Sequence, residues 1–220
     1  MLIEAVQAIS GLTVPDPGFL AGLSALCNQH DVPLALDEIW NGIGRTGRWF
    51  GFEFAGIIPD LVVMGKGLSA GLPLSAVAAG ERFLGYWPSG MHTSTFQGNP
   101  LACAMAVATI DTICAERLLD HVKAIATDLT LQLQPLVGRY GVSALRVVGA
   151  QAAIVFCNGD GQLDLGRSEL IQRLMLRQEI LVYGGGREGE CVLLVPPLNL
   201  SLDLLSEALN RLIAQIEQTA

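Results

Sequence analysis

Asp37 and Lys66 are the two residues whose types and spacing carry the most chemistry in this sequence. Each follows a short apolar run, LAL before Asp37 and LVVMG before Lys66, and Gly-rich segments follow both. An amine at the end of a buried strand can form a Schiff base with an aldehyde, and a carboxylate can keep a heterocyclic nitrogen protonated. These two groups, 29 residues apart, are what a pyridoxal-phosphate site requires.

Lys66 taken alone has two interpretations. Loss of hydration at a buried strand end favours the neutral, nucleophilic amine. A lysine whose stem runs along apolar surface to reach water would instead be structural. Asp37 favours the first interpretation, because it also stands at the carboxyl end of a strand, where open α/β sheets bind their ligands.

Two segments partly match nucleotide-binding motifs, but neither match is complete. Residues 42–47, GIGRTG, match G-x-G-x-x-G after a strand, but a helix should follow and the sequence continues with RWFGF. A phosphate-binding P-loop around Lys66 fails as well, because Asp60 stands where the first glycine is needed and Gly67 where Ser or Thr is needed.

The apolar runs that should position Asp37 and Lys66 predict a sheet covered on both faces, because they do not alternate with polar residues. The expected elements are strands at 1–6, 34–37, 61–64 and 75–79, a helix at 20–30, and two long helices over 101–119 and up to 140. This pattern predicts an α/β domain with a mostly parallel sheet.

The pattern changes after Gly141. Short strands are expected at 145–148, 153–157, 180–182 and 192–195, with helices at 168–177 and 202–217 between and after them. Such an order is typical of a small α+β unit. We therefore expect two domains, a large one over residues 1–125 and a small carboxyl-terminal one over 126–220.

Composition excludes several classes of function. Hydrophobic residues make up 51% of the 220-residue chain, which predicts a substantial core. A net charge of −8 argues against nucleic-acid binding, which needs clustered Lys and Arg. The sequence has no run of about 18 apolar residues that could span a membrane. We expect a soluble, cytoplasmic protein.

No metal site is expected. The cysteines show no C-x-x-C pair, and the histidines show no ligand grouping. Buried, reduced thiols are the interpretation we favour for the cysteines. The residues concerned are Cys27, Cys103, Cys114, Cys157, Cys191, His30, His92 and His121.

Four segments in this order resemble the class III aminotransferases of pyridoxal-phosphate fold type I, the group of ornithine, acetylornithine and 4-aminobutyrate transaminases. They read DEIWNGIGRTG, PDLVVMGKGLSAGLPLSAVAAG, HTSTFQGNPLA and LLVPPLNLS, and the similarity covers essentially the whole chain. The resemblance implies a transaminase that moves an amino group between an amine or amino acid and a keto acid or aldehyde. It also implies a homodimer whose active sites are shared between subunits.

The resemblance implies roles for individual residues. Lys66 is the Schiff-base lysine and proton shuttle, and Asp37 is the partner of the pyridine nitrogen. Thr95 matches a threonine that reaches the cofactor phosphate of the other subunit; a turn residue before a helix is the other interpretation of Thr95. Glu38 should point to the opposite face from Asp37 and is expected to be structural. Glu4 falls on a family glutamate whose role we do not assign.

The chain departs from the family at its substrate and ring positions. A glutamate and a carboxylate-binding arginine that pair in many members are replaced here by Ile9 and Leu193. Paired loss avoids a lone buried charge and predicts a more apolar substrate pocket. Arg187 is a possible substitute carboxylate ligand or a solvated loop residue. Trp40 stands where the family often has Gln, and it either packs beside the cofactor ring or fills the core below it.

The family members also have an amino-terminal region with a phosphate loop and a ring-stacking aromatic residue, which the resemblance places before Met1. We therefore expect the 220 residues alone to bind pyridoxal phosphate weakly or not at all. Other functions left open are a non-catalytic fragment, one subunit of a split transaminase that associates with its other half, and a related aminomutase.

Overall fold

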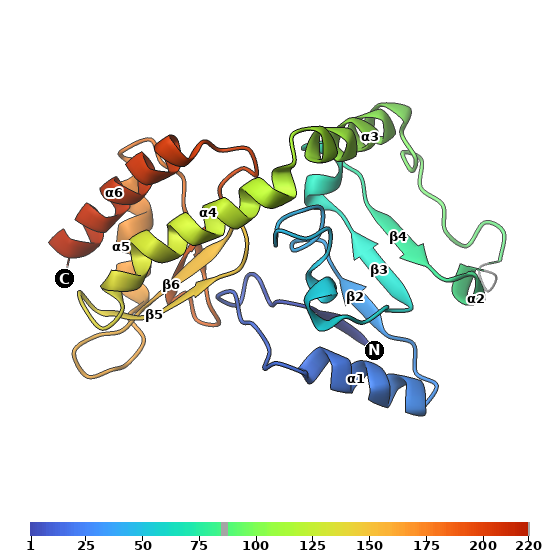
Figure 1. The fold of residues 1–220 in the computed structure, drawn as a ribbon, viewed down its shortest axis with the longest axis horizontal. Helices are drawn as coiled ribbons and strands as arrows, with labels where there is room; N and C mark the ends of the chain where they lie inside the picture. The colour runs from blue at the N-terminus through green and yellow to red at the C-terminus, as the bar shows by residue number, and fades with distance from the viewer. Residues whose placement is uncertain (85–87, 220) are drawn as a thin grey trace. The chain divides into compact units, whose positions relative to one another are not determined.

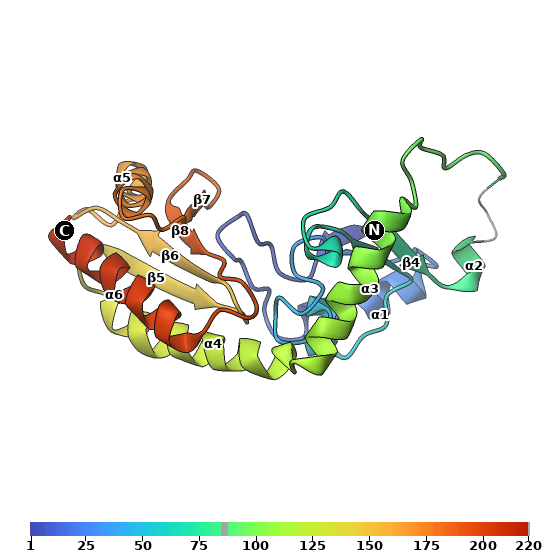
Figure 2. The same cartoon turned by 90° about the horizontal axis from the view of Figure 1, so that it is seen from above.

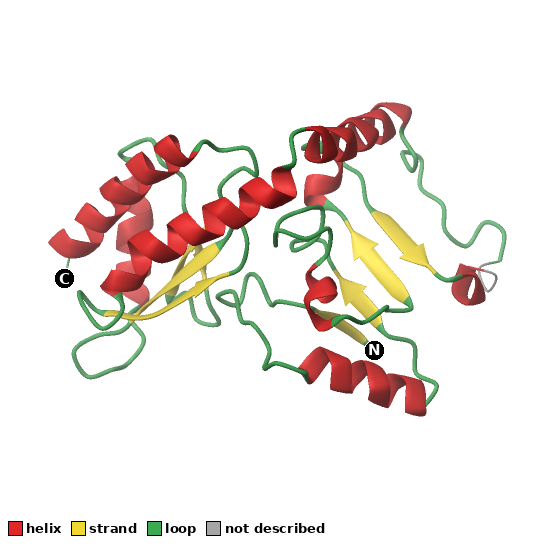
Figure 3. Ribbon diagram, viewed as in Figure 1, coloured by secondary structure: helices red, strands yellow, loops and turns green. Residues whose placement is uncertain are grey.

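The computed structural model describes residues 1–84 and 88–219, and Figure 1 shows their fold. The chain forms two compact units. The first comprises residues 1–6 and 14–119, and the second comprises residues 7–13 and the chain from residue 120 onward. The sequence does not predict that residues 7–13 belong to the second unit. Helices and strands follow one another along both units (Figure 3).

The first unit is built on a mostly parallel sheet, as the sequence predicts. The sheet has the order β1-β2-β3-β4, in which β1, β2 and β3 run parallel and β4 runs antiparallel to β3. The elements of this unit are β1 (Leu2–Glu4), α1 (Phe19–Gln29), β2 (Ala35–Asp37), η1 (Gly51–Ala55), β3 (Leu61–Met64), η2 (Lys66–Ser69), β4 (Ala76–Ala79), α2 (Glu81–Leu84) and α3 (Pro100–Ala115).

Local sequence explains where these elements begin and end. The parallel strands are apolar except at their carboxyl ends, where β2 ends in Asp37 and is followed by Glu38, and β3 is followed by Gly65. Asn99 begins α3, because its side-chain oxygen accepts hydrogen bonds from the amides of Leu101 and Ala102. The strand predicted over residues 1–6 is shorter in the structure, since its pairing with β2 covers only residues 2–4.

One core cluster of the first unit lies between α1 and the sheet. Leu20 and Cys27 of α1 pack with Ala5, Leu34 and Leu36 from the sheet side. The side chains of β3 are only half-buried, so the expectation of a sheet covered on both faces is not met by the described residues. Burial by α1 is confined to the part of the sheet formed by β1 and β2.

The cysteines of α3 differ from expectation. Cys103 and Cys114 are exposed, whereas Cys27 and Cys191 are buried and Cys157 is half-buried. Residues 103 and 114 are about three helical turns apart and therefore share a face of α3. The sequence prediction of buried thiols is thus wrong for these two residues, because α3 is apolar on nearly all sides and its pattern does not mark a solvent face.

The second unit is an antiparallel sheet with helices. Its strand order is β5-β6-β8-β7, and all neighbouring strands are antiparallel. Its elements are α4 (Leu118–Leu133), which starts at the end of the first unit, η3 (Gln134–Leu136), β5 (Val142–Val147), β6 (Ala152–Phe156), α5 (Leu165–Leu176), β7 (Tyr183–Gly185), β8 (Cys191–Leu194) and α6 (Leu202–Gln218). The α+β organisation that the sequence predicts is present.

One strand of this unit is displaced from its predicted position. The sequence predicts residues 180–182, but β7 is Tyr183–Gly185. Its two glycines are closely packed: a Cβ on Gly185 would clash with the Leu193 side chain, and one on Gly184 would lie 2.8 Å from Nε2 at the end of the Gln172 side chain. Glycine in a strand marks close packing of this kind, which β-propensity does not detect.

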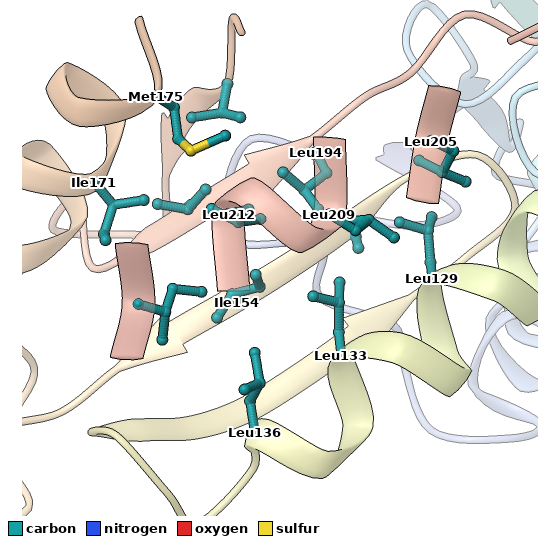
Figure 4. Packing of buried hydrophobic residues seen from close by; sticks show 14 of the residues in the cluster. Leu129, Leu133, Leu136, Ile154, Ile171, Met175, Leu194, Leu205, Leu209 and Leu212 are labelled. Atoms are coloured by element: carbon teal, nitrogen blue, oxygen red, sulfur yellow. The ribbon is translucent and has the colours of Figure 1, made fainter. Parts of the chain in front are cut away.

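The core of the second unit is larger and lies on one face of its sheet. The helices α4 and α6 run beside each other (Figure 2) and are joined by the side chains of Gln132 and Ser206, with a 2.8 Å hydrogen bond. Leu133, Ile154 and Leu209 converge in the centre of the cluster (Figure 4). These leucines and isoleucines recur at helical and strand periods, so the sequence pattern predicts this core well.

Residues 7–13 cover the opposite face of the same sheet. Arg146 is paired with Ala153, and Ala153 with Leu193, so these three side chains share the face opposite Ile154. Arg146 Nη1 donates a 2.6 Å hydrogen bond to the carbonyl of Gly11. A main-chain bond of 2.9 Å from Gly186 to the carbonyl of Ile9 adds a second attachment.

Candidate functional site

Asp37 and Lys66 lie at the same edge of the first sheet. Asp37 is the last residue of β2, and it is paired with Val63 of the parallel neighbour β3. Lys66 follows the end of β3 by two residues and begins η2. Because β2 and β3 are parallel and adjacent, the structure brings the carboxylate and the amine to the carboxyl ends of neighbouring strands, where α/β sheets bind ligands.

One of the two carboxylate oxygens of Asp37 accepts a hydrogen bond. Its Oδ1 accepts a 3.0 Å hydrogen bond from the amide of Ile39, and among the described residues the other oxygen has no hydrogen-bond donor. The side chain is half-buried. One oxygen therefore fixes the orientation of the carboxylate, and the other can accept a hydrogen bond from a protonated ring nitrogen.

Lys66 stands in an unusual backbone conformation. Its φ is 41°, in the left-handed region that side chains other than glycine seldom adopt. Backbone strain of this kind is concentrated at functional sites. The side chain is exposed, and within the described part of the chain the amine makes no ion pair. It therefore remains available for a covalent bond.

Trp40 places its ring against that amine. The Nζ of Lys66 lies 4.5 Å from the centroid of the Trp40 ring, a distance at which an ammonium is attracted by the ring face. Trp40 is half-buried, three residues after Asp37. The structure therefore brings together Asp37, Trp40 and Lys66 of the residues that the sequence singles out.

Glu38 connects this site to the loop that follows it. The carboxylate is fully buried and accepts hydrogen bonds of 2.9 Å from the amide of Gly51 and 3.0 Å from that of Phe52. Burial raises the pKa of Glu38 to about 7, although the two amides act in the opposite direction and Asp37 adds a further increase. Glu38 holds the loop of residues 38–52 closed, a contact that the sequence does not reveal.

Asn41 attaches the same loop to the chain just after β1. Its Nδ2 donates a 2.6 Å hydrogen bond to the carbonyl of Val6, and the residue is fully buried. Gly42 sits so close that a Cβ would lie 2.6 Å from the carbonyl oxygen of Glu38. The glycines of the GIGRTG motif thus serve a tight loop and not a dinucleotide, and the Asn-Gly pair is the sequence signal for this turn.

Thr95 is exposed in the chain segment before α3, and no contact in the described residues joins it to Asp37 or Lys66. Its expected partner is a cofactor phosphate in a second subunit. That role stays a prediction.

Ile9 and Leu193 approach the same glycine in the second unit. A Cβ on Gly185 would lie 2.4 Å from Leu193 Cδ1 and 3.0 Å from the carbonyl oxygen of Ile9. Leu193 is 3% exposed, whereas Ile9 is 54% exposed. Arg187 is exposed in the loop between β7 and β8, and its amide donates to Glu190 Oε1 over 3.4 Å.

Glu190 and Arg146 are polar residues near this face that sequence reasoning missed. Glu190 accepts hydrogen bonds from the amides of residues 187 and 188, and these lower its pKa although burial opposes them. Arg146 holds the segment of residues 7–13, as described above. An arginine between apolar residues of a strand was the available signal for this contact.

An apolar cavity of about 170 Å³ lies in the second unit between α5, the end of β8 and α6. Its lining includes Met175, Leu194 and Leu209 and contains no titratable side chain. Within residues 1–84 and 88–219, no three His, Cys, Asp or Glu side chains are grouped as a metal site would need. Over the same residues, no helix has the length and apolar character of a membrane span.

Comparison with known proteins gives a consistent family assignment. The family model described as aminotransferase class III matches residues 1–216. The chain is 38% identical over 211 residues to an acetylornithine aminotransferase of Gloeobacter violaceus, covering 95% of this chain and 50% of that protein. It is 35% identical over 218 residues to a 4-aminobutyrate aminotransferase of Mycobacterium leprae, covering 96% and 48%.

Solved structures share the fold. An amine transaminase from an uncultivated Pseudomonas species, in its pyridoxal-phosphate-bound form, has a TM-score of 0.91 at 30% identity, and the match covers 100% of this chain and 52% of that one. Ornithine aminotransferase of Plasmodium falciparum has a TM-score of 0.90 at 28% identity, with coverages of 99% and 56%. The chain spans about half the length of the relatives it matches.

Proposed function

The chain belongs to the class III aminotransferase family, and from this premise we propose that it takes part in pyridoxal-phosphate-dependent amino-group transfer. The reaction would move the amino group between an amine or amino acid and a keto acid or aldehyde. The observation that carries the proposal is the position of the Lys66 amine and the Asp37 carboxylate at the ends of adjacent parallel strands.

The residues present fit this cofactor. When bound, pyridoxal phosphate supplies an electron sink for negative charge that develops on the substrate carbon. Lys66 would hold the cofactor through its amine, and the same amine, once released, would carry a proton to or from the substrate carbon. The amide of Ile39 orients the Asp37 carboxylate through one oxygen. The other oxygen would accept a hydrogen bond from the protonated ring nitrogen of the cofactor.

The phosphate end of the cofactor is supported by fewer residues. We assign Thr95 to the phosphate of a second subunit by resemblance to the family, which makes a homodimer part of the proposal; a cytoplasmic location is proposed as well. We also propose that residues 1–125 belong to a large cofactor-binding domain and that residues 126–220 form a small domain, with the segment 7–13 against the sheet of the small one.

The substrate pocket is proposed to be more apolar than in relatives that act on acidic substrates. The buried Leu193 and the neighbouring Ile9 replace a charged pair of the family. An amine donor without a second carboxylate suits such a pocket. Arg187 is the alternative ligand for a substrate carboxylate, and its exposure leaves it accessible.

Borohydride trapping tests the proposal with unusual clarity, because the chain has only two lysines, Lys66 and Lys123. The 220-residue protein is incubated with pyridoxal phosphate, reduced and mapped by mass spectrometry. The expected result is a reduced adduct on Lys66 in excess over Lys123. Because the 220 residues alone are expected to bind the cofactor weakly, its concentration is raised until adducts form on either lysine. The proposal fails if Lys66 is labelled no more than Lys123 at every concentration.

A further inference from the structure

Trp40 and Lys66 form a cation–π contact at this edge of the sheet, with Nζ 4.5 Å from the ring centroid. We propose that Trp40 is a positioning residue that holds the Lys66 ammonium against its ring face until a carbonyl compound takes the amine. The catalytic meaning of this contact rests on the proposed function, but the contact itself does not.

The chemistry of the indole limits what the contact can be. An indole has one N–H donor and no acceptor for the ammonium protons. Its ring face nevertheless carries negative charge density that attracts a cation and has little attraction for a neutral amine. The contact therefore restrains the resting, charged side chain and must break when the amine reacts. An aromatic neighbour therefore lowers the reactivity of the Lys66 amine without forming an ion pair with it.

The backbone of Lys66 sets where its side chain starts. Lys66 begins η2 with a φ of 41°, in the left-handed region. Among the described residues, the Lys66 amine makes no ion pair that would hold it away from the ring. Asp37, the carboxylate of the proposed site, ends the neighbouring strand, and the lysine side chain keeps access to solvent.

The ring is placed by the closed loop of residues 38–52. Glu38 holds the far end of this loop through the amides of Gly51 and Phe52. Asn41, the residue next to Trp40, is attached to the carbonyl of Val6 over 2.6 Å. These two buried anchors lie on either side of Trp40 in sequence, so the indole is held by the loop and does not depend on Lys66 for its position.

Competitive labelling of the two lysines measures the contact directly. The protein is treated with a limiting amount of an amine-acylating reagent, and the ratio of modified Lys66 to modified Lys123 is determined by peptide mass spectrometry. Lys123 is an internal standard, because it is exposed and paired with Asp120 over 2.9 Å on α4. Trp40→Leu is expected to raise the ratio about two- to fivefold, the factor that corresponds to an exposed cation–π contact.

Two matched variants separate the ring from general loosening of the loop. Trp49→Phe changes another tryptophan of the loop and is expected to leave the ratio at the wild-type value. Trp40→Phe keeps a weaker aromatic face and should give an intermediate ratio, and it carries the test alone if Trp40→Leu does not fold. Thermal unfolding followed by circular dichroism shows which variants are folded.

The inference is overturned if folded Trp40→Leu leaves the ratio unchanged, or if Trp49→Phe raises it equally. It is also overturned if Trp40→Phe gives the same increase as Trp40→Leu. None of these readings uses the cofactor. Trapping of pyridoxal phosphate on Lys66 no greater than on Lys123 would therefore defeat the proposed function and leave the Trp40 contact standing. An unchanged acylation ratio in folded Trp40→Leu would overturn the role of Trp40 and leave the proposed function standing.

Discussion

The carboxylate of Glu38 accepts a 2.9 Å hydrogen bond from the amide of Gly51, across the closed loop that follows Asp37. The same carboxylate accepts the amide of Phe52 over 3.0 Å. Glu38 thereby couples the end of β2 to η1, and its protonation state bears on the stability of the first unit.

The stability of the first unit is expected to fall as pH rises through the range set by Glu38. Its pKa is raised from 4.5 to about 7, mainly by burial. Between these values the folded chain binds more protons than the unfolded chain, so the free energy of unfolding decreases with pH. The decrease is at most about 3 kcal/mol. Urea unfolding at pH 5 and pH 7.5 measures it.

Tryptophan fluorescence reports on the first unit, because all three tryptophans precede residue 90 in the sequence. Glu38→Gln is expected to flatten the pH dependence of the free energy of unfolding, since a glutamine side chain does not titrate. Glu169→Gln, at an exposed position of α5, is the control and should keep the wild-type slope. An unchanged slope in Glu38→Gln would show that other groups cause the dependence.

Two glycine substitutions are expected to act in opposite directions. Gly42→Ala places a Cβ 2.6 Å from the carbonyl oxygen of Glu38 and 3.2 Å from Phe50, which should destabilise the first unit by about 1–3 kcal/mol. Gly22→Ala lies within α1 with no atom within 4 Å of the new Cβ, and it should stabilise by about 0.5–1 kcal/mol. Fluorescence-detected urea unfolding compares both with wild type. Equal stabilities would contradict the loop geometry.

The sequence predicts most of the fold because its signals are local. The apolar runs before Asp37 and Lys66 mark β2 and β3, and the leucine periods of α4 and α6 mark the larger core. The placement of residues 7–13 on the second sheet depends on Arg146 and Gly11, which are 135 residues apart in sequence. No local pattern encodes such a pairing.

The site is predictable to a similar extent and for the same reason. Asp37 and Lys66 are indicated by residue type at strand ends, so the sequence identifies them. The contact between Trp40 and Lys66 and the closure by Glu38 require the three-dimensional course of the loop. Glu38 follows Asp37 directly, and only the position of the η1 amides shows that it is an anchor.

Thiol reactivity should divide the cysteines into clear classes. Cys103 and Cys114 are exposed on α3, whereas Cys27 and Cys191 are buried. Burial, together with the neighbouring Glu190, raises the pKa of Cys191 to about 11, which further disfavours its thiolate. Timed alkylation at pH 8 with peptide mapping should modify Cys103 and Cys114 first and Cys191 last. Early labelling of Cys191 would contradict its placement beneath residues 7–13.

The paired replacement at Ile9 and Leu193 can be tested by restoring charge one residue at a time. Leu193 is 3% exposed, so Leu193→Arg alone introduces a buried, unpartnered cation and should cost about 3–5 kcal/mol. Ile9→Glu alone changes an exposed side chain and should cost much less. The double variant should recover at least about 1 kcal/mol if the new side chains pair, since the main chain of Ile9 and the side chain of Leu193 both lie next to Gly185.

Circular dichroism in urea gives the four stabilities of this cycle, and the coupling energy is their double difference. Ile9→Gln with Leu193→Arg is the matched control, since it keeps the size of the side chain and removes the negative charge. Coupling that appears only with Ile9→Glu would show that the two positions can hold an ion pair. Additive effects in both combinations would mean that the two side chains do not meet. The proposal that the apolar pocket arose by loss of a charge pair would then be wrong.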